Sequence, residues 1–255
     1  MIKRELYMNR IRPFIGGELI KVMTGIRRSG KSVMLELIKE ELAEAGVAPS
    51  QMISINFEDM RYSHLQTATA LHDEIIKRAE GIEGKAYLFF DEIQEVEGWE
   101  KCVNSLRVAL DCDIYITGSN AKLLSGELAT YIGGRYVEFV IYPFSFAEFL
   151  ELYHTIAPSD SIQQCFQKYL LAGGMPYLAN LRYEEEPSRQ YLTDLFNSVQ
   201  LKDIVKRNKI RDIDLLERII AYMTANVGTV FSASSLAKFF KNEQRTVAAE
   251  TILNY

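Results

Sequence analysis

Short apolar runs alternate with helical stripes over the first half of the chain. The runs predict buried strands, and the stripes, in which apolar residues recur every three to four positions, predict helices with one buried face. The predicted strands are Leu19–Thr24, Met52–Phe57, Ala86–Phe90, Ile114–Thr117 and Val137–Tyr142. The predicted helices between them are Lys31–Ala45, Leu65–Ala79 and the segment from Trp99 to Leu110. This alternation predicts an α/β fold in which a five-stranded parallel sheet carries helices on both faces.

The pattern turns helical after Pro143. The helices predicted there are Ser145–His154, Ser161–Ala172, Arg189–Arg207, Leu215–Asn226, Ser234–Phe240 and Thr246–Tyr255. The last two are joined by a short polar turn and fit a helix-turn-helix, with Thr246 as the N-cap of the second helix. The residues expected on its inward face are Val247, Thr251, Ile252 and Tyr255. Because the chain stops inside this periodic helix, we expect it to be part of a longer protein.

A glycine-containing motif, GIRRSGKS, lies between the first predicted strand and the next helix. Its form, GxxxxGK[ST], is typical of a phosphate-binding loop, in which backbone N–H groups converge on phosphates next to a helix N-terminus. Lys31 would place its charge on the β- and γ-phosphates, and Ser32 would give its hydroxyl to Mg²⁺. The candidate ATP-binding residues are Gly25, Ile26, Arg27, Arg28, Ser29, Gly30, Lys31, Ser32 and Val33. A glycine turn without a function is the alternative interpretation.

Two acids, Asp91 and Glu92, end the apolar run Tyr87–Phe90. A buried strand cannot hide two carboxylates unless a cation meets them, and Mg²⁺ would do so. Asp91 is therefore the candidate to hold Mg²⁺ through its water shell. Glu92 is the candidate base for the water that attacks the γ-phosphate. Exposed acids at the end of a strand are the alternative.

Two further segments carry candidate contacts to the γ-phosphate. At the end of the fourth strand, Ser119 or Asn120 could orient the attacking water, or the same segment could be a turn that caps the next helix. Arg135 follows a glycine pair just before the fifth strand and could reach the γ-phosphate of its own chain or of a neighbour. The alternative for Arg135 is a surface arginine after a glycine turn.

With these features in this order, the sequence resembles the AAA+ P-loop ATPases, in particular the archaeal-type ATP-binding proteins related to the STAND and origin-recognition ATPases. The similar stretches are GIRRSGKS, FFDEIQEVEGWE, ITGSN, GGRYVEFVIYPFSFAEF and Gly173–Pro176. The resemblance implies hydrolysis of MgATP, with Ser119 or Asn120 as the sensor. It implies Arg135 as a finger that acts on the next subunit of a head-to-tail homo-oligomer. It adds Pro176, in a Gly-x-Pro turn of the helical lid, as a residue near the nucleotide.

The resemblance also implies three domains. An AAA+ core would cover residues 1–143, a helical lid 144–185, and a helical C-terminal domain 186–255. The last resembles the domain of unknown function that usually follows this core, with part of a winged helix at its end. Members of the family generally continue beyond the position of Tyr255.

DNA contact has little support in the residues. A DNA-reading helix presents base-contacting and phosphate-contacting side chains near its N-terminus, but only Arg245 and Thr246, followed by Glu250, stand there. A second basic stretch holds Lys202, Lys206, Arg207, Lys209 and Arg211. A solvated helix face or contact with protein is the alternative in both places.

Composition adds exclusions. The net charge is -5, and the acidic excess lies in residues 1–156, with 17 Lys and Arg against 23 Asp and Glu. Residues 157–255 hold 12 against 11, so any nucleic-acid contact belongs there. Three cysteines without CxxC spacing and three scattered histidines argue against a disulfide framework and a zinc site. With no signal peptide and no apolar run that could span a bilayer, we expect a cytoplasmic protein without a membrane partner.

Three hypotheses about function follow. The first is an ATPase that couples hydrolysis to a conformational switch of the C-terminal helices, with DNA-related or defence processes as candidate settings. The second is a module that senses ATP without hydrolysing it and contacts DNA or protein, against which Glu92 argues. The third is a P-loop small-molecule kinase, for which the chain shows no acceptor-binding motif.

Overall fold

The computed structural model describes residues 2–118, 132–199, 204–205, 210–243 and 245–255. The chain forms two compact units, Met1–Arg189 and Gln190–Tyr255, and each has its own core of buried apolar side chains. No helix within the described ranges is both long and apolar enough to cross a membrane. The predicted division into core, lid and C-terminal domain stays a prediction.

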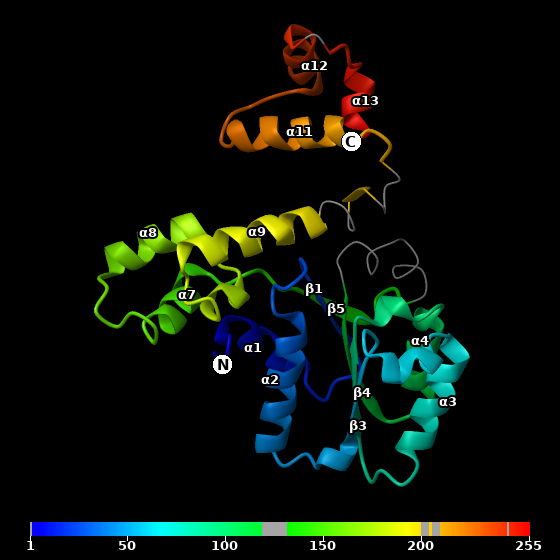
Figure 1. Ribbon diagram of the computed structural model, residues 1–255. Coiled ribbons are helices and arrows are strands. Elements are labelled where there is room, and N and C mark those ends of the chain that lie inside the picture. Colours follow the sequence, from blue (N-terminus) through cyan, green and yellow to red (C-terminus); the bar gives the residue numbers. More distant parts are fainter. Residues whose placement is uncertain (1, 119–131, 200–203, 206–209, 244) are drawn as a thin grey trace. The chain divides into compact units, whose positions relative to one another are not determined.

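Five parallel strands form the sheet of the first unit, in the order β2-β3-β4-β1-β5 (Figure 1). The strands are β1 (Ile20–Thr24), β2 (Met52–Asn56), β3 (Ala86–Asp91), β4 (Cys112–Thr117) and β5 (Tyr136–Val140). Each lies on one of the predicted runs, so the predicted parallel sheet is confirmed. Because the strands are parallel, the segments that follow β1 and β3 both lie at the carboxyl ends of the sheet, separated there only by β4.

Helices cover both faces of this sheet, as predicted. They are α1 (Glu5–Ile11), α2 (Lys31–Glu44), α3 (Ala68–Ala79) and α4 (Trp99–Ala109). Successive residues of a strand face opposite sides, so Phe89 packs with the side chains of α1 and α2, whereas Leu88 and Phe90 pack with those of α3 and α4. Figure 1 shows α2 on one side of the sheet and α3 and α4 on the other. Burial of each such side chain contributes about 1.5–3 kcal/mol.

Near α1 and α3 the local structure differs from the sequence-based expectation. Helix α1 was not predicted, and the helix expected from Leu65 begins later, after Thr67. The Thr67 hydroxyl accepts a hydrogen bond from the Ala70 N–H (3.4 Å), and this N-cap requires extended backbone at Thr67, which separates α3 from the turn before it. The short 3-10 helices are η1 (Arg12–Phe14), η2 (Pro49–Gln51), η3 (Met60–Leu65), η4 (Ile93–Glu95) and η5 (Pro176–Ala179).

The helical pattern predicted after Pro143 is confirmed for the described residues, although the helix expected from Arg189 begins earlier, at Glu185. The helices there are α7 (Phe146–Tyr153), α8 (Ile162–Ala172) and α9 (Glu185–Val199). Ser145 and Ser161 each begin a helix with a capping box, in which the serine hydroxyl and the side chain three residues later satisfy each other's backbone N–H. The ring of Tyr183, just before α9, packs edge-on against Phe149 of α7 at 5.0 Å between centroids.

The second unit is a small helical bundle. Its regular helices within residues 210–243 and 245–255 are α11 (Ile213–Ala225), α12 (Ala233–Asn242) and α13 (Ala249–Leu253). Their buried contacts are Leu215, Ile219, Leu236, Phe240 and Ile252.

The prediction for the last helix is wrong at its start. Thr246 is not its N-cap, because α13 begins at Ala249, with extended backbone at Ala248. The β-branched Thr246 and Val247 favour extended backbone, and Val247 packs on the core of the unit. Thr251, which was expected to face inward, is exposed.

A buried ion pair joins β1 and β4 near their amino ends. The ammonium group of Lys21 contacts the Asp113 carboxylate, and both side chains are 0% exposed. Lys21 also donates to the carbonyl of Leu19 (2.9 Å), while Asp113 accepts from the Tyr115 hydroxyl (2.7 Å) and the Gly16 N–H (2.7 Å). Burial lowers the pKa of Lys21, and the neighbouring Asp113 offsets only part of that effect. The pair is therefore satisfied as a unit and is costly to break.

We expect Asp113→Asn to lower the free energy of unfolding by about 3–5 kcal/mol, because Lys21 would remain as a buried charge without a counter-ion. Urea denaturation measures this loss. The matched control is Asp111→Asn, which removes an ion pair between the exposed Asp111 and the half-buried Lys85 and should cost at most about 1 kcal/mol. Equal losses in the two variants would contradict the prediction.

Candidate functional site

The loop between β1 and α2 has the backbone shape that its glycines allow. Gly25 has a φ of 142° and Gly30 a φ of 100°, and Arg28 between them also has a positive φ of 62°. A Cβ atom on Gly25 would lie 2.2 Å from the carbonyl oxygen of Ile141, so only glycine fits there. The loop therefore packs directly on the segment that follows β5.

Lys31, the first residue of α2, lies within the curve of this loop. Its Nζ donates to the carbonyl oxygens of Gly25 and Ile26, each at 3.2 Å, and its side chain is 5% exposed. The same Nζ lies 3.9 Å from Oε1 of Glu92. The structure thus brings together the lysine and the acid that the sequence singled out separately.

The remaining loop residues lie near the surface, except Ser29. Ser32 and Val33, in the first turn of α2, are exposed, as are Ile26 and Arg28. Arg27 lies 3.5 Å from the carboxylate of Glu58. The Ser32 hydroxyl is therefore accessible beside Lys31, as a magnesium-binding hydroxyl must be.

Asp91 ends β3 as a buried carboxylate with a partner on each neighbouring strand. The Thr117 hydroxyl, at the end of β4, donates to its Oδ1. The amide of Asn56, at the end of β2, donates to its Oδ2 at 3.1 Å. Both oxygens of Asp91 are thereby oriented from either side, which limits the directions in which it can meet a cation.

Glu92 is turned out of the strand by a left-handed backbone conformation, with φ 54° and ψ 47°. Such a conformation costs about 1–3 kcal/mol in a residue other than glycine. The Glu92 N–H donates to the Thr117 hydroxyl oxygen at 3.0 Å, and Gln94 donates to the carboxylate at 2.5 Å. With its side chain 16% exposed, Glu92 faces the loop while remaining open to solvent on one side.

Thr117 and Asn56 were not recognised as site residues from the sequence. Thr117 contacts both acids through one hydroxyl, and Asn56 contacts Asp91. The signal that could have found them is their position, because each is the last residue of a strand adjacent to β3.

The oxygen ligands around the loop suit Mg²⁺. Magnesium prefers hard oxygen donors, retains several waters and is usually held by one or two protein side chains together with phosphate oxygens. The Ser32 hydroxyl and the Asp91 carboxylate supply such donors. Among the described residues, no group of three or more His, Cys, Asp or Glu side chains could hold a metal ion by itself.

The predicted sensor residues Ser119 and Asn120 lie outside the described residues. Gly118, the residue before them, donates its N–H to the Met23 carbonyl of β1 at 3.3 Å. The strand that leads to them, β4, runs between the strand of the phosphate loop and the strand of the acids.

Arg135 is not brought to the phosphate loop of its own chain. It precedes β5, its carbonyl accepts from the Ile20 N–H at 3.0 Å, and its guanidinium donates to Asn104 of α4 at 3.2 Å. The parallel pairing of β1 with β5 places Arg135 beside Ile20, at the amino end of β1. Gly25 follows the other end of β1, about 16 Å from Ile20 at the usual rise of a strand. Contact with a γ-phosphate in the same chain is therefore not favoured.

The turn that contains Pro176 contacts the phosphate loop through the segment that follows β5. The backbone N–H of Phe144 donates to the Gly174 carbonyl at 2.7 Å, and a Cβ on Gly174 would lie 2.1 Å from the Phe144 carbonyl oxygen. Phe144 follows Ile141, whose carbonyl adjoins Gly25. The turn that contains Pro176 is thus packed on the same segment as the phosphate loop.

Comparison with known families decides where the chain belongs. Residues 18–150, more than half of the chain, match a family described as AAA domain. The chain belongs to this AAA family. Residues 163–255 match a second family, described as a domain of unknown function, so the predicted order of an AAA core followed by such a domain is confirmed.

Two curated relatives of the AAA protein are longer than this chain. An uncharacterized protein of Haemophilus influenzae is 38% identical over 256 residues, which covers 100% of this chain and 63% of the relative. An uncharacterized protein of Methanocaldococcus jannaschii is 32% identical over 248 residues, which covers 92% of this chain and 53% of the relative. The chain therefore spans less than two thirds of the length of these relatives.

The solved structures that resemble this chain are more distant in sequence. A mutant of Thermotoga maritima RuvB has 14% identity and a TM-score of 0.48, covering 98% of this chain and 82% of that chain. The Aeropyrum pernix ORC1 protein in complex with DNA has 13% identity and a TM-score of 0.45, covering 98% and 80%. No residue role follows from similarity this distant.

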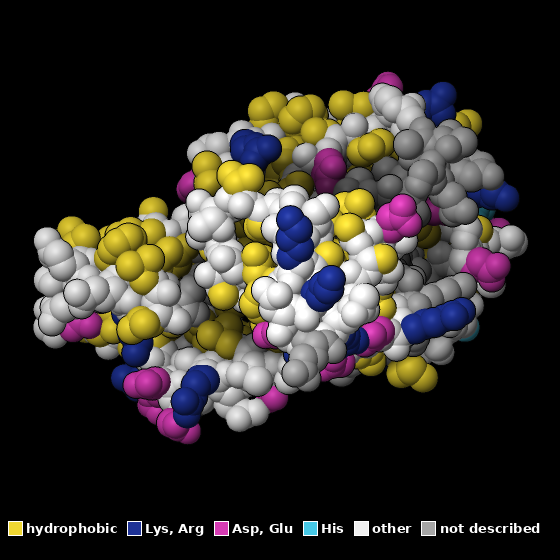
Figure 2. Space-filling view, turned by 90° about the horizontal axis from the view of Figure 1, so that it is seen from above, with side chains coloured by type: hydrophobic (Ala, Val, Ile, Leu, Met, Phe, Trp, Pro, Cys, Tyr) yellow, Lys and Arg dark blue, Asp and Glu magenta, His cyan; other side chains and the backbone are white. Residues whose placement is uncertain are grey.

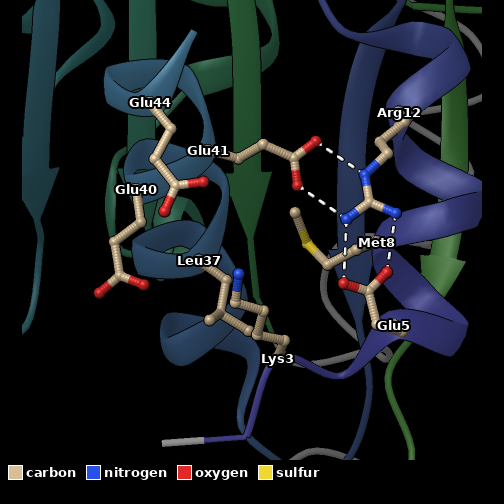
Figure 3. Close-up of a pocket in the computed structure, with 8 residues that line it drawn as sticks. All are labelled: Lys3, Glu5, Met8, Arg12, Leu37, Glu40, Glu41 and Glu44. Carbon is tan, nitrogen blue, oxygen red and sulfur yellow. Dashed lines mark hydrogen bonds and ion pairs between the residues drawn. The ribbon is translucent and has the colours of Figure 1, made fainter.

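A pocket of about 200 Å³ lies between α1 and α2, apart from the phosphate loop (Figure 3). Its lining is Lys3, Glu5, Met8, Arg12, Leu37, Glu40, Glu41 and Glu44. Arg12 bridges Glu5 and Glu41 with hydrogen bonds of 2.7 to 3.1 Å. The four glutamates disfavour phosphate there, and none of the predicted site residues lines the pocket.

The cation expected near the start of the last helix is already paired. Arg245 contacts the carboxylates of Asp212 and Asp214, which begin α11. Most of the other basic stretch, Lys202, Lys206, Arg207 and Lys209, lies outside the described residues. On the face drawn in Figure 2, the Lys and Arg side chains stand apart from one another among acidic and apolar ones. These observations add no support to DNA contact.

We expect Thr117→Val to lower the free energy of unfolding by about 1–3 kcal/mol, because the buried Asp91 carboxylate and the Glu92 N–H would both lose a partner. Chemical denaturation measures the loss. Thr117→Ser keeps the hydroxyl and should restore most of the stability. A valine variant as stable as the serine variant would show that the hydroxyl does not hold the acids.

Proposed function

We propose that the AAA domain binds MgATP in the loop Gly25–Ser32 and hydrolyses it to ADP and phosphate, with Glu92 as the base. The observation that carries this proposal is the 3.9 Å separation between Nζ of Lys31 and Oε1 of Glu92. The lysine that would neutralise the γ-phosphate and the acid that would take a proton from water then belong to one site.

Each residue of the site has a distinct proposed task. Lys31 binds the β- and γ-phosphates, backbone N–H groups from Ile26 to Val33 bind the phosphate chain, and Ser32 and Asp91 hold Mg²⁺. When bound, Mg²⁺ neutralises charge on the phosphate oxygens. Thr117 and Asn56 orient the acids through the contacts described above, and this limits the loss of entropy when the site is filled.

Three further residues are proposed to lie near the nucleotide. Ser119 or Asn120 would sense the γ-phosphate from the end of β4, and Pro176 would lie near the nucleotide.

We propose that the ATPase cycle drives a conformational switch of the helical region that follows the core. DNA contact is an expectation from the sequence alone, and the proposed cycle does not depend on it.

We expect Lys31→Ala to weaken MgATP binding at least about 10-fold, because it removes a charged donor to the phosphates. Glu92→Gln should keep the binding and lower turnover about 10²- to 10⁴-fold, because the amide has the shape of the acid without its basicity. A fluorescent nucleotide titration and a phosphate-release assay measure the two effects. Chelation of Mg²⁺ should stop turnover in the unchanged protein.

Glu97→Gln is the matched control, since Glu97 is an exposed acid five residues beyond Glu92. It should leave binding and turnover as they are. Phosphate release by Glu92→Gln within two- to three-fold of the unchanged protein would remove Glu92 from the mechanism. Tight MgATP binding without turnover in the unchanged protein would favour a module that senses ATP.

We further propose that Arg135 acts on the nucleotide of the next subunit in a head-to-tail homo-oligomer. Its place before β5, at the end of the sheet away from its own loop, supports action on a neighbour. An arginine that reaches a γ-phosphate contributes about 10³–10⁵ in rate. Arg135→Ala should therefore lose most turnover while it keeps MgATP binding.

Mixing inactive variants tests this role. A subunit with Arg135→Ala retains Glu92 and could use Arg135 of a neighbour that carries Glu92→Gln, so phosphate release should return in part. The control mixes Arg135→Ala with the double variant Arg135→Ala/Glu92→Gln, in which no subunit supplies the arginine. Mixed assemblies that form but stay inactive in both mixtures would rule out action between subunits.

A further inference from the structure

Arg4 is a buried arginine at the edge of the phosphate loop. It precedes α1, outside residues 18–150 that match the AAA family, and its side chain is only 2% exposed. Its backbone has a left-handed conformation, with φ 47° and ψ 49°. A buried arginine in a strained conformation requires strong contacts to hold it.

The guanidinium of Arg4 joins three segments that are distant in the sequence. Nη1 donates to the carbonyl oxygen of Ser29 in the phosphate loop at 3.0 Å. Nη2 donates to the Tyr142 carbonyl after β5 at 2.8 Å. Nε donates to Oε1 of Glu148, in the first turn of α7, at 2.8 Å.

Aromatic rings shield this contact from water. The guanidinium carbon lies 4.6 Å from the ring centroid of Tyr7 and 5.1 Å from that of Phe144. The Tyr142 N–H donates to the Tyr7 hydroxyl oxygen at 3.0 Å, which ties α1 to the same segment. Charge-assisted hydrogen bonds are stronger when water is excluded, so the three segments are held firmly together.

Glu148 is held as an ionised partner. Burial by itself would raise the pKa of Glu148, but the hydrogen bonds from Arg4 and Ser145 outweigh it and keep the pKa below its ordinary value. Oε2 of Glu148 also accepts from the N–H of Ser145 at 2.8 Å, in the capping box that begins α7. The ion pair is therefore continuous with the start of that helix.

The Ser29 carbonyl matters for phosphate binding because of its peptide plane. A trans peptide unit is planar, so the Ser29 C=O and the Gly30 N–H point in opposite directions and turn together. Arg4 holds the carbonyl and thereby fixes the direction of the Gly30 N–H. That N–H belongs to the loop whose amides would bind the phosphates.

We propose that Arg4 is a positioning residue that couples the phosphate loop to α7, so that the Arg4–Glu148 pair sets the affinity of the loop for nucleotide. This inference rests on the proposed binding of MgATP by the loop. Arg4 does not touch the reacting atoms. Its effect should therefore fall on nucleotide affinity and leave turnover at saturating ATP nearly unchanged.

The test measures the Kd of MgATP and the turnover at saturating ATP in Arg4→Lys, Glu148→Gln and the double variant. Lysine keeps the buried charge, but its ammonium group cannot reproduce the planar set of donors that reaches three acceptors. We expect each single variant to raise Kd at least about 10-fold. The double variant should be no weaker than the worse single one, because both break the same link.

Arg12→Gln is the matched control. Arg12 lies in η1, just beyond α1, and makes paired hydrogen bonds to Glu5 and Glu41 away from the loop (Figure 3). It should lower thermal stability without changing Kd. A Kd shift in Arg12→Gln equal to that in Arg4→Lys would overturn the proposal, because the effect would then be general destabilisation.

Two further outcomes separate this inference from the proposed function. Unchanged Kd in Arg4→Lys and Glu148→Gln would overturn the coupling, while loss of binding in Lys31→Ala would still support the nucleotide site. Additive Kd shifts in the double variant would also overturn the coupling. Absence of MgATP binding to the unchanged protein would overturn the proposed function and this inference with it.

Discussion

The carboxylate of Asp91 ends strand β3 in the interior of the sheet, and it cannot remain there without donors. Its two neighbours supply them, because Thr117 ends β4 and Asn56 ends β2. The Thr117 hydroxyl also accepts the N–H of Glu92, so one side chain orients both acids. The strand order therefore does more than close a core, since it determines which polar side chains meet at the carboxyl edge.

The two ends of the sheet have different roles. Near the amino ends of β1 and β4, Lys21 and Asp113 form a fully buried ion pair, and Asp113 also accepts hydrogen bonds from the Gly16 N–H and the Tyr115 hydroxyl. At the carboxyl ends, Lys31 and Glu92 lie 3.9 Å apart, and the side chain of Glu92 remains partly exposed. Charge at the first end stabilises one arrangement of strands, whereas charge at the second end is available to a ligand.

Backbone contacts carry the site beyond the sheet. Gly25 packs against the Ile141 carbonyl, and Gly174 packs against the Phe144 carbonyl. The phosphate loop and the turn before η5 therefore both pack on the segment that follows β5. Arg4 adds a charged link from the same loop to α7. A change in the conformation of the loop would therefore first displace α7 and the turn at Gly174. These packed contacts are a physical route for the proposed conformational switch.

The sequence alone determined the strands, most of the helices and the two motifs of the site, because apolar periodicity and glycine spacing are local properties. It could not determine the partners of Asp91, the link made by Arg4 or the pairing of Arg245 with Asp212 and Asp214. Each joins residues far apart in the chain, from 25 to 144 positions. It also left open whether Arg135 reaches its own loop, and the parallel pairing of β1 with β5 disfavours this. Such contacts depend on strand order and on how loops pack, which local propensity does not specify, so only the tertiary structure decided them.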